Sequence, residues 1–117
     1  MPSDKPLQRL NDIIENIDRI VQYTHKQTLD RFKQDSLTRD AVERCLLRIS
    51  EAARKLEGVV DEVASDQPWA DIRALGNVIR HEYDAIDPSV IWSIVENDLL
   101  PLEKAVQAAI EKLERKR

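Results

Sequence analysis

The sequence predicts an all-α protein that folds as an antiparallel four-helix bundle with short connections. Apolar residues recur at intervals of three and four over most of the chain, which is the period of amphipathic helices. Prolines and polar residues divide these patterns into four segments. The 117 residues contain only two glycines, too few for a fold built on tight β-hairpin turns. We therefore expect one helical domain over residues 1–117, a length that supports a single hydrophobic core.

The first apolar pattern begins near Pro6, because proline suits the first turn of a helix, and it fades around residues 25–27. Its positions follow helical spacing: Leu7, Leu10, Ile13, Ile14, Ile17, Ile20, Val21 and Thr24. A polar stretch over residues 28–39 comes next. Leu29 and Phe32 lie three residues apart within it, so they predict one short helical turn.

The second pattern is one continuous apolar stripe that runs through Gly58. Its positions are Val42, Cys45, Leu46, Ile49, Ala52, Ala53, Leu56, Val59, Val60 and Val63. A glycine inside a helix costs about 1 kcal/mol relative to alanine, so Gly58 is expected to weaken this helix. Cys45 is the only cysteine, and its place in the stripe predicts a buried, unreactive thiol.

The third and fourth patterns each begin at a proline. The third starts at Pro68, and its apolar positions are Ile72, Leu75, Ile79, Tyr83 and Ile86. The fourth starts at Pro88, with Asp87 as its N-cap, and its apolar positions extend over residues 91–113. Pro101 lies inside it and is expected to kink or break the helix, because proline has no backbone N–H and crowds the preceding turn.

The third helix places a histidine on the side opposite the core. If each residue advances 100° around the helix from Ile72, His81 points directly away from the apolar side. Ala70 and Ala74 lie beside it, and such small residues allow another helix to approach closely. One flank carries Arg73, Asn77, Arg80 and Asp84. On periodicity alone, this arrangement is typical of a solvated helix face.

The same residue types also fit a catalytic interpretation. A histidine beside an asparagine and arginines can transfer protons and stabilise the negative charge of a phosphorane, as metal-independent RNA cleavage requires. No glycine-rich phosphate loop is present, and the spacing of His25, Cys45 and His81 fits no metal site, so we expect neither metal nor cofactor. Trp69 and Trp92 are interpreted as packing anchors rather than platforms for base stacking.

Charge and hydropathy limit the partners and the location of the protein. The net charge of −4 does not have the overall footprint of a nucleic-acid binder, although it leaves room for a local basic cleft. The basic tail over residues 112–117 is interpreted as a solvated helix end. No secretory signal is visible, and no apolar run approaches the roughly 20 residues needed to span a membrane. These features predict a cytoplasmic protein without membrane contact.

The segment WADIRALGNVIRHEY, residues 69–83, resembles the motif helix of the HepT-like ribonuclease toxins of the HEPN superfamily. The resemblance extends through residues 87–92 and 97–102, and upstream to residues 49–53. The family motif is an arginine, four residues, a histidine, one residue and a tyrosine. His81 and Tyr83 match it, and Asn77 matches an asparagine that commonly follows the arginine. The arginine position itself is Gly76, so Arg73 or Arg80 is the candidate substitute.

The resemblance implies an HEPN-like bundle and a homodimer whose motif helices meet across the two-fold axis around an RNA cleft. It also implies a minimal nucleotidyltransferase antitoxin of the MntA type that silences the toxin by AMPylation of Tyr83. By the helical count, Tyr83 is expected to point towards the core. That direction conflicts with modification of Tyr83 unless the helix ends near His81. Asp84, Asp87 and Pro88 favour such an end.

Two functions follow from these observations. The first is a metal-independent endoribonuclease toxin of a type VII-like toxin–antitoxin pair. In this interpretation His81 is the acid and base, and Asn77 with Arg73 or Arg80 steadies the phosphate. The alternative is a catalytically degenerate helical dimer that binds a nucleotidyltransferase, and Gly76 favours it.

Overall fold

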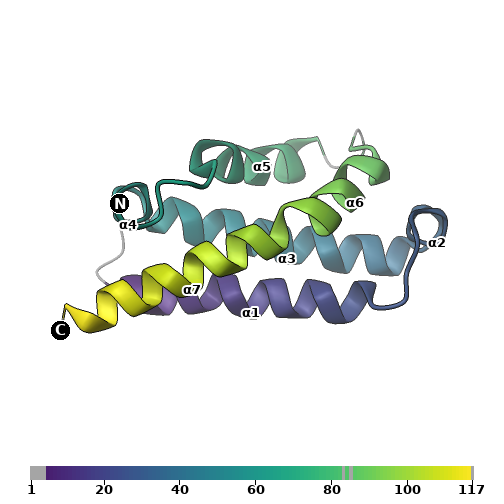
Figure 1. The fold of residues 1–117 in the computed structure, drawn as a ribbon. Helices are drawn as coiled ribbons and strands as arrows, with labels where there is room; N and C mark the ends of the chain where they lie inside the picture. The colour runs from purple at the N-terminus through teal and green to yellow at the C-terminus, as the bar shows by residue number, and fades with distance from the viewer. Residues whose placement is uncertain (1–4, 83, 85, 117) are drawn as a thin grey trace.

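The computed structural model describes residues 5–82, 84 and 86–116, and it contains α-helices and no strand within those ranges. Helices α1 (Pro6–Thr24) and α3 (Ser36–Lys55) run antiparallel along one another. Helix α5 (Trp69–His81) packs on α3, α6 (Pro88–Asn97) contacts α2, and α7 (Leu99–Arg115) returns along α1 (Figure 1). The chain therefore alternates direction through its long helices, and the predicted all-α bundle is confirmed.

The predicted polar connection is mostly helical. Helix α2 (Leu29–Gln34) begins where the Thr28 side chain accepts a hydrogen bond from the Arg31 N–H, over 3.2 Å. Helix α3 then begins at Ser36 rather than near Val42, because the Asp35 carboxylate accepts a hydrogen bond from the Thr38 N–H over 3.1 Å. The apolar stripe alone does not show this earlier start, since the first turns of α3 are polar.

The prediction of one continuous helix through Gly58 is wrong. Helix α3 ends at Lys55, and a short helix, α4 (Val59–Val63), follows. Gly58 has a φ of +89°, a left-handed conformation that glycine adopts at little cost and that ends a helix. Leu56 and Val60, on either side of the break, are both fully buried. The apolar stripe therefore packs in the core although the helix does not continue through it.

Prolines and caps define the last helices as predicted. The Asp87 carboxylate accepts a hydrogen bond from the Ser89 N–H over 2.9 Å, and α6 begins at Pro88. The fourth pattern is broken at Asp98, between α6 and α7. Pro101 lies in the first turn of α7, where backbone N–H groups have no partner within the helix, so its missing N–H costs nothing there.

The core confirms the interpretation of the cysteine and the tryptophans. Cys45 is 1% exposed, and burial raises the pKa of its thiol, which keeps it protonated and unreactive. Trp69 is buried and its indole N–H donates to the Ala64 carbonyl oxygen over 2.6 Å. The Trp92 ring lies 5.2 Å from the Phe32 ring, which joins α6 to α2.

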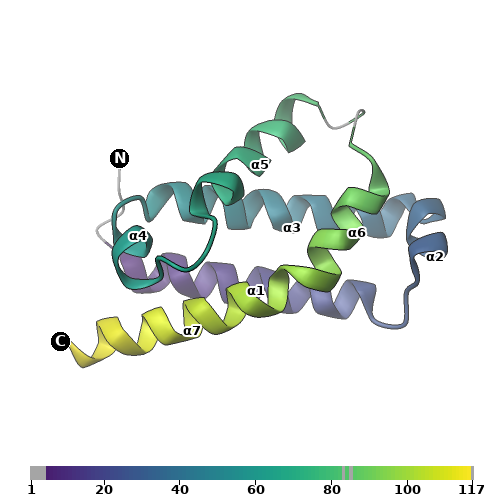
Figure 2. The ribbon, with the colours of Figure 1, turned by 45° about the horizontal axis from the view of Figure 1, so that its top comes forward.

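Helix α5 stands apart from α6 and α7. Its extensive contacts are with α3, and the two later helices diverge from it in Figure 2. One face of α5 is therefore covered by the bundle, and its other face remains accessible.

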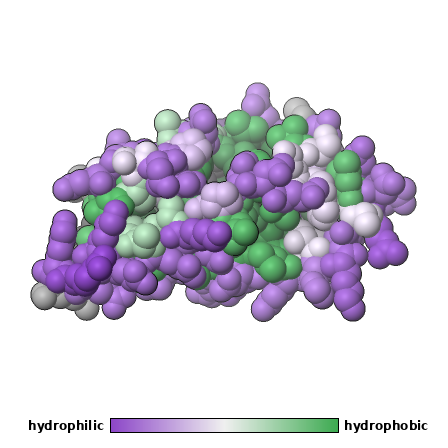
Figure 3. Space-filling view, in the orientation of Figure 1, coloured by the Kyte–Doolittle hydropathy of each residue, from purple (hydrophilic) through white to green (hydrophobic). Residues whose placement is uncertain are grey.

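Polar side chains cover most of the molecular face drawn in Figure 3, with apolar patches between them. Among the described helices, none combines the length and the apolar character that crossing a membrane requires.

Candidate active site at the α3–α5 contact

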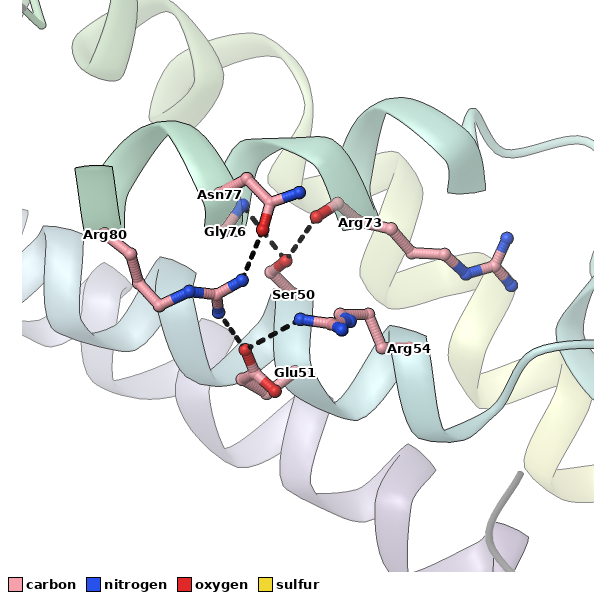
Figure 4. Close-up of polar contacts among 7 residues, drawn as sticks. All are labelled: Ser50, Glu51, Arg54, Arg73, Gly76, Asn77 and Arg80. Atoms are coloured by element: carbon pink, nitrogen blue, oxygen red, sulfur yellow. Dashed lines mark hydrogen bonds and ion pairs between the residues drawn. The ribbon is translucent and has the colours of Figure 1, made fainter. Parts of the chain in front are cut away.

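Helices α3 and α5 are in close contact where Ser50 meets Gly76. Ser50 is fully buried, and its hydroxyl donates to the Arg73 carbonyl oxygen over 2.9 Å and accepts from the Gly76 N–H over 3.1 Å (Figure 4). A Cβ atom at Gly76 would overlap the Ser50 hydroxyl oxygen and lie 2.9 Å from the Ser50 Cβ. The absence of a side chain at position 76 therefore permits this helix spacing.

Arg80 and Asn77 form one polar cluster with Glu51 of α3. The Arg80 guanidinium donates to the Glu51 carboxylate with one nitrogen and to the Asn77 side-chain oxygen with another (Figure 4). The Arg54 guanidinium lies 3.6 Å from the same carboxylate. Glu51 therefore orients Arg80, and Arg80 in turn orients the Asn77 amide. The structure brings these two predicted site residues together.

Arg73 is turned away from this cluster. Its guanidinium donates to the Ala53 carbonyl oxygen over 3.2 Å and to the Asp61 carboxylate over 3.0 Å. In Figure 4 this side chain extends in the direction opposite to Arg80. The hydrogen bond from Arg73 also holds the pKa of Asp61 below its ordinary value. Arg73 thus connects α5 to α3 and α4, and it does not meet Asn77 or Arg80.

His81 is the last residue of α5 and is exposed, as the helical count predicts. Its side chain makes no hydrogen bond or ion pair within the described ranges, so its imidazole is accessible to a ligand. The helix ends here rather than at Ile86, since Glu82 is its C-cap. Tyr83 lies outside the described residues. Ala70 and Ala74 are exposed on the same helix.

A shallow polar hollow of about 440 Å³ lies between α3 and α5 beside this cluster. Asn77, Arg73 and Ala74 line it from α5, Glu51, Arg54 and Lys55 line it from α3, and Glu57 lines it just after the end of α3. Three cationic side chains and two carboxylates thus line the hollow, a small excess of positive charge that suits an anionic ligand such as a phosphate. Across the described part of the chain, no group of histidine, cysteine, aspartate or glutamate side chains is placed to hold a metal ion.

Sequence reasoning assigned no role to Ser50 or Glu51. Both lie in the segment 49–53, which carries part of the family resemblance. The available signal was the position of Ser50 inside the apolar stripe of α3, between Ile49 and Ala53. A polar residue at a core position needs a hydrogen-bond partner, and that partner is the backbone of α5.

Comparison with known proteins places the chain in a family. The family model described as "Ribonuclease HepT-like" matches residues 13–109. The chain is 31% identical to "Putative RNase MJ1380" of Methanocaldococcus jannaschii, over 84% of this chain and 90% of that protein. It is 32% identical to "Putative RNase MJ0127" of the same organism, over 97% of this chain and 94% of that protein.

A further relative is "Probable ribonuclease HepT" of Thermococcus cleftensis, 29% identical over 80% of this chain and 86% of that protein. No solved structure matches the chain significantly. The family match covers most of the bundle, including the α3–α5 contact and the histidine at the end of α5. This chain belongs to the HepT-like ribonuclease family.

Proposed function

We propose that the protein is a metal-independent endoribonuclease that acts as a cytoplasmic toxin. The observation that carries this proposal is the exposed His81 at the end of α5, one residue after an Arg80 that is already oriented together with Asn77. Family membership supports the same activity, since the relatives above are named as RNases. The hollow beside Asn77 offers space for a backbone phosphate.

The proposed reaction needs one proton acceptor, one proton donor and positive charge near phosphorus. The ribose 2′-oxygen attacks the adjacent phosphorus while its proton passes to the imidazole of one His81. The bond from phosphorus to the 5′-oxygen breaks, and that oxygen takes a proton from the imidazolium of a second His81. Arg80 and Asn77 donate hydrogen bonds to the phosphorane oxygens, where such donors are most effective.

The second His81 comes from a homodimer in this proposal. The outer face of α5 supports it, because Ala70, Ala74 and Val78 are exposed at successive intervals of four residues, and His81 follows on the same side. Small and apolar residues allow two α5 helices to pack closely. Sedimentation equilibrium at tens of micromolar should show a dimer, and a monomer throughout that range would contradict the shared site.

The activity is tested with purified protein and labelled RNA in the presence of a chelator. Cleavage that persists without divalent metal supports the nuclease. Products that carry 2′,3′-cyclic phosphate ends would support the attack by the 2′-oxygen. RNA that stays intact at high protein concentration would contradict the proposal.

A nucleotidyltransferase of the MntA type is the proposed antitoxin of a type VII-like pair. It would transfer AMP from ATP to Tyr83: the phenol oxygen attacks the α-phosphorus, pyrophosphate leaves, and the phenol loses its proton. The end of α5 at His81 supports this assignment, because the conflict with modification arises only if the helix continues past His81.

The alternative is a catalytically degenerate dimer that binds the nucleotidyltransferase. The Ser50–Gly76 contact favours it, because the family's arginine does not fit at position 76 while Ser50 occupies that space. In this case the purified protein should form a stable complex with the nucleotidyltransferase and leave RNA intact.

A further inference from the structure

A groove of about 480 Å³ between α1 and α3 carries a local excess of positive charge. Five of its lining residues are basic and three are acidic, although the chain as a whole has a net charge of −4. The acidic residues are all neutralised: Asp12 pairs with Arg9, Glu15 with Arg19, and Glu51 with Arg80. The unpaired charge of this groove is therefore positive.

That charge lies along α3. Arg44, Arg48 and Lys55 line the groove on one face of this helix, and none of them forms an ion pair with another described residue. At 1.5 Å per residue, Arg44 and Lys55 are about 16 Å apart along the helix axis. A row of cations at this spacing matches several successive phosphates of a nucleic-acid backbone better than it matches a single small anion.

The groove also contains an acceptor without a partner. Asn16 of α1 is 6% exposed, and its Nδ2 donates to the Asp12 carbonyl oxygen over 2.8 Å. Because a carbonyl only accepts, this bond determines which end of the amide carries the oxygen. Asn16 Oδ1 is buried and has no hydrogen-bond partner among the residues that the structure describes, although buried polar atoms nearly always have one. A ligand that brings a hydroxyl donor would satisfy it.

The groove leads to the candidate active site. Glu51 and Lys55 line both this groove and the hollow that contains Asn77 and Arg73. A volume of about 480 Å³ is in the range of sites for one small ligand, so the groove has room for a short stretch of one strand.

We propose that the groove between α1 and α3 binds the backbone of single-stranded RNA and guides it to Asn77 and Arg80. Arg44, Arg48 and Lys55 contact successive phosphates, and Asn16 Oδ1 accepts a hydrogen bond from a ribose 2′-hydroxyl. The 2′-hydroxyl is the group that distinguishes RNA from DNA, so Asn16 makes the groove selective for RNA. This inference rests on the proposed function for the identity of the substrate.

The test is fluorescence anisotropy with a labelled 12-nucleotide RNA and a DNA of the same sequence, in full-length His81→Ala protein so that binding is separated from cleavage. Arg44→Ala with Lys55→Ala should weaken RNA binding at least tenfold. Each lost phosphate contact should also reduce the slope of log K against log salt by about 0.7. Lys104→Ala with Arg115→Ala is the matched control, because it removes the same charge from α7 outside the groove. The control should bind RNA as His81→Ala does.

Asn16→Leu tests the selectivity, since leucine keeps the branched shape of asparagine and removes its oxygen together with the Nδ2 that donates to the Asp12 carbonyl oxygen. This variant should lose affinity for RNA and keep its affinity for DNA. Circular dichroism melting curves confirm that each variant is folded. Equal affinity for RNA and DNA before this substitution, or equal losses in the groove and control variants, would overturn the proposal.

RNA binding in the groove and nuclease activity are separate proposals, and different results would contradict each of them. RNA binding that depends on Arg44 and Lys55, in a protein whose wild type leaves RNA intact, would support the groove and contradict the nuclease. Cleavage by the wild type that is unchanged in the Arg44→Ala, Lys55→Ala variant would support the nuclease and contradict the groove.

Discussion

The Ser50 hydroxyl oxygen lies 3.1 Å from the backbone nitrogen of Gly76, in the space that a side chain at position 76 would need. This contact joins α3 to α5 beside Arg80 and Asn77. The glycine at the motif arginine position is thus part of a helix–helix contact, and a change at either residue affects the spacing of the site.

Gly76→Ala should destabilise the protein by about 1–2 kcal/mol, measured by urea unfolding, because overpacking usually costs more than the gain in helix propensity. Ser50→Gly removes the atoms that the new methyl group would meet. In that background the effect of Gly76→Ala should shrink or change sign, which is the coupling that a double-mutant cycle measures. Equal effects in both backgrounds would contradict the steric explanation.

His81→Ala should lower RNA cleavage by about 10²–10⁴-fold, the usual contribution of a general acid or base. Because His81 is exposed, its replacement should change stability by about 0.5 kcal/mol or less. His25→Ala is the matched control, since His25 is the other histidine and is also exposed. A similar loss of cleavage in both variants would argue against a specific role for His81.

Arg80→Ala and Arg73→Ala should separate two roles. Arg80→Ala should lower the cleavage rate constant at saturating RNA by about 10²–10³-fold, as loss of a transition-state donor does. Arg73→Ala should instead lower stability by about 1–2 kcal/mol, because it removes a hydrogen bond to Ala53 and an ion pair to Asp61. Asp61→Asn, which loses the ion pair alone, should cost less. The opposite pattern would identify Arg73 as the substitute for the motif arginine.

Tyr83→Phe should abolish AMPylation by a co-expressed nucleotidyltransferase of the MntA type, as detected by intact mass. The chain has two tyrosines, so Tyr23→Phe is the control and should retain the AMP adduct. An adduct that persists on Tyr83→Phe would place the modification at another residue.

Asp35→Asn should reduce the dependence of stability on acidic pH. Hydrogen bonds from Thr38 hold the pKa of Asp35 below its ordinary value, so this carboxylate stabilises the folded state above the unfolded pKa of about 3.9. The stabilisation is lost as pH falls through the lower, folded-state pKa. Asparagine also caps helices but does not titrate. Between about pH 5 and 2, the free energy of unfolding should therefore fall less in Asp35→Asn than in wild type. Unfolding curves recorded at several pH values in that interval measure this difference.

Local patterns in the sequence predicted much of the fold. The helix that begins at Pro6, the break near Pro101 and the buried Cys45 all follow from helical periodicity and from the backbone chemistry of proline. The exposure of His81 follows from the same count, because its direction depends only on the turns of its own helix. The end of that helix at His81 was indicated by Asp84, Asp87 and Pro88 downstream.

Only the tertiary structure showed where the backbone breaks and which residues from different helices are in contact. The stripe around Gly58 reads as one helix because its apolar spacing is unbroken, and only the folded backbone shows the left-handed turn there. The periodicity of α5 placed Arg73 and Arg80 on one flank. It did not show that Arg73 pairs with Asp61 or that Arg80 pairs with Glu51. Glu51 and Arg80 are 29 residues apart, and their contact exists because Ser50 and Gly76 let α3 and α5 approach closely. Helical periodicity determines the face on which a side chain lies, whereas the packing of helices determines which side chains meet.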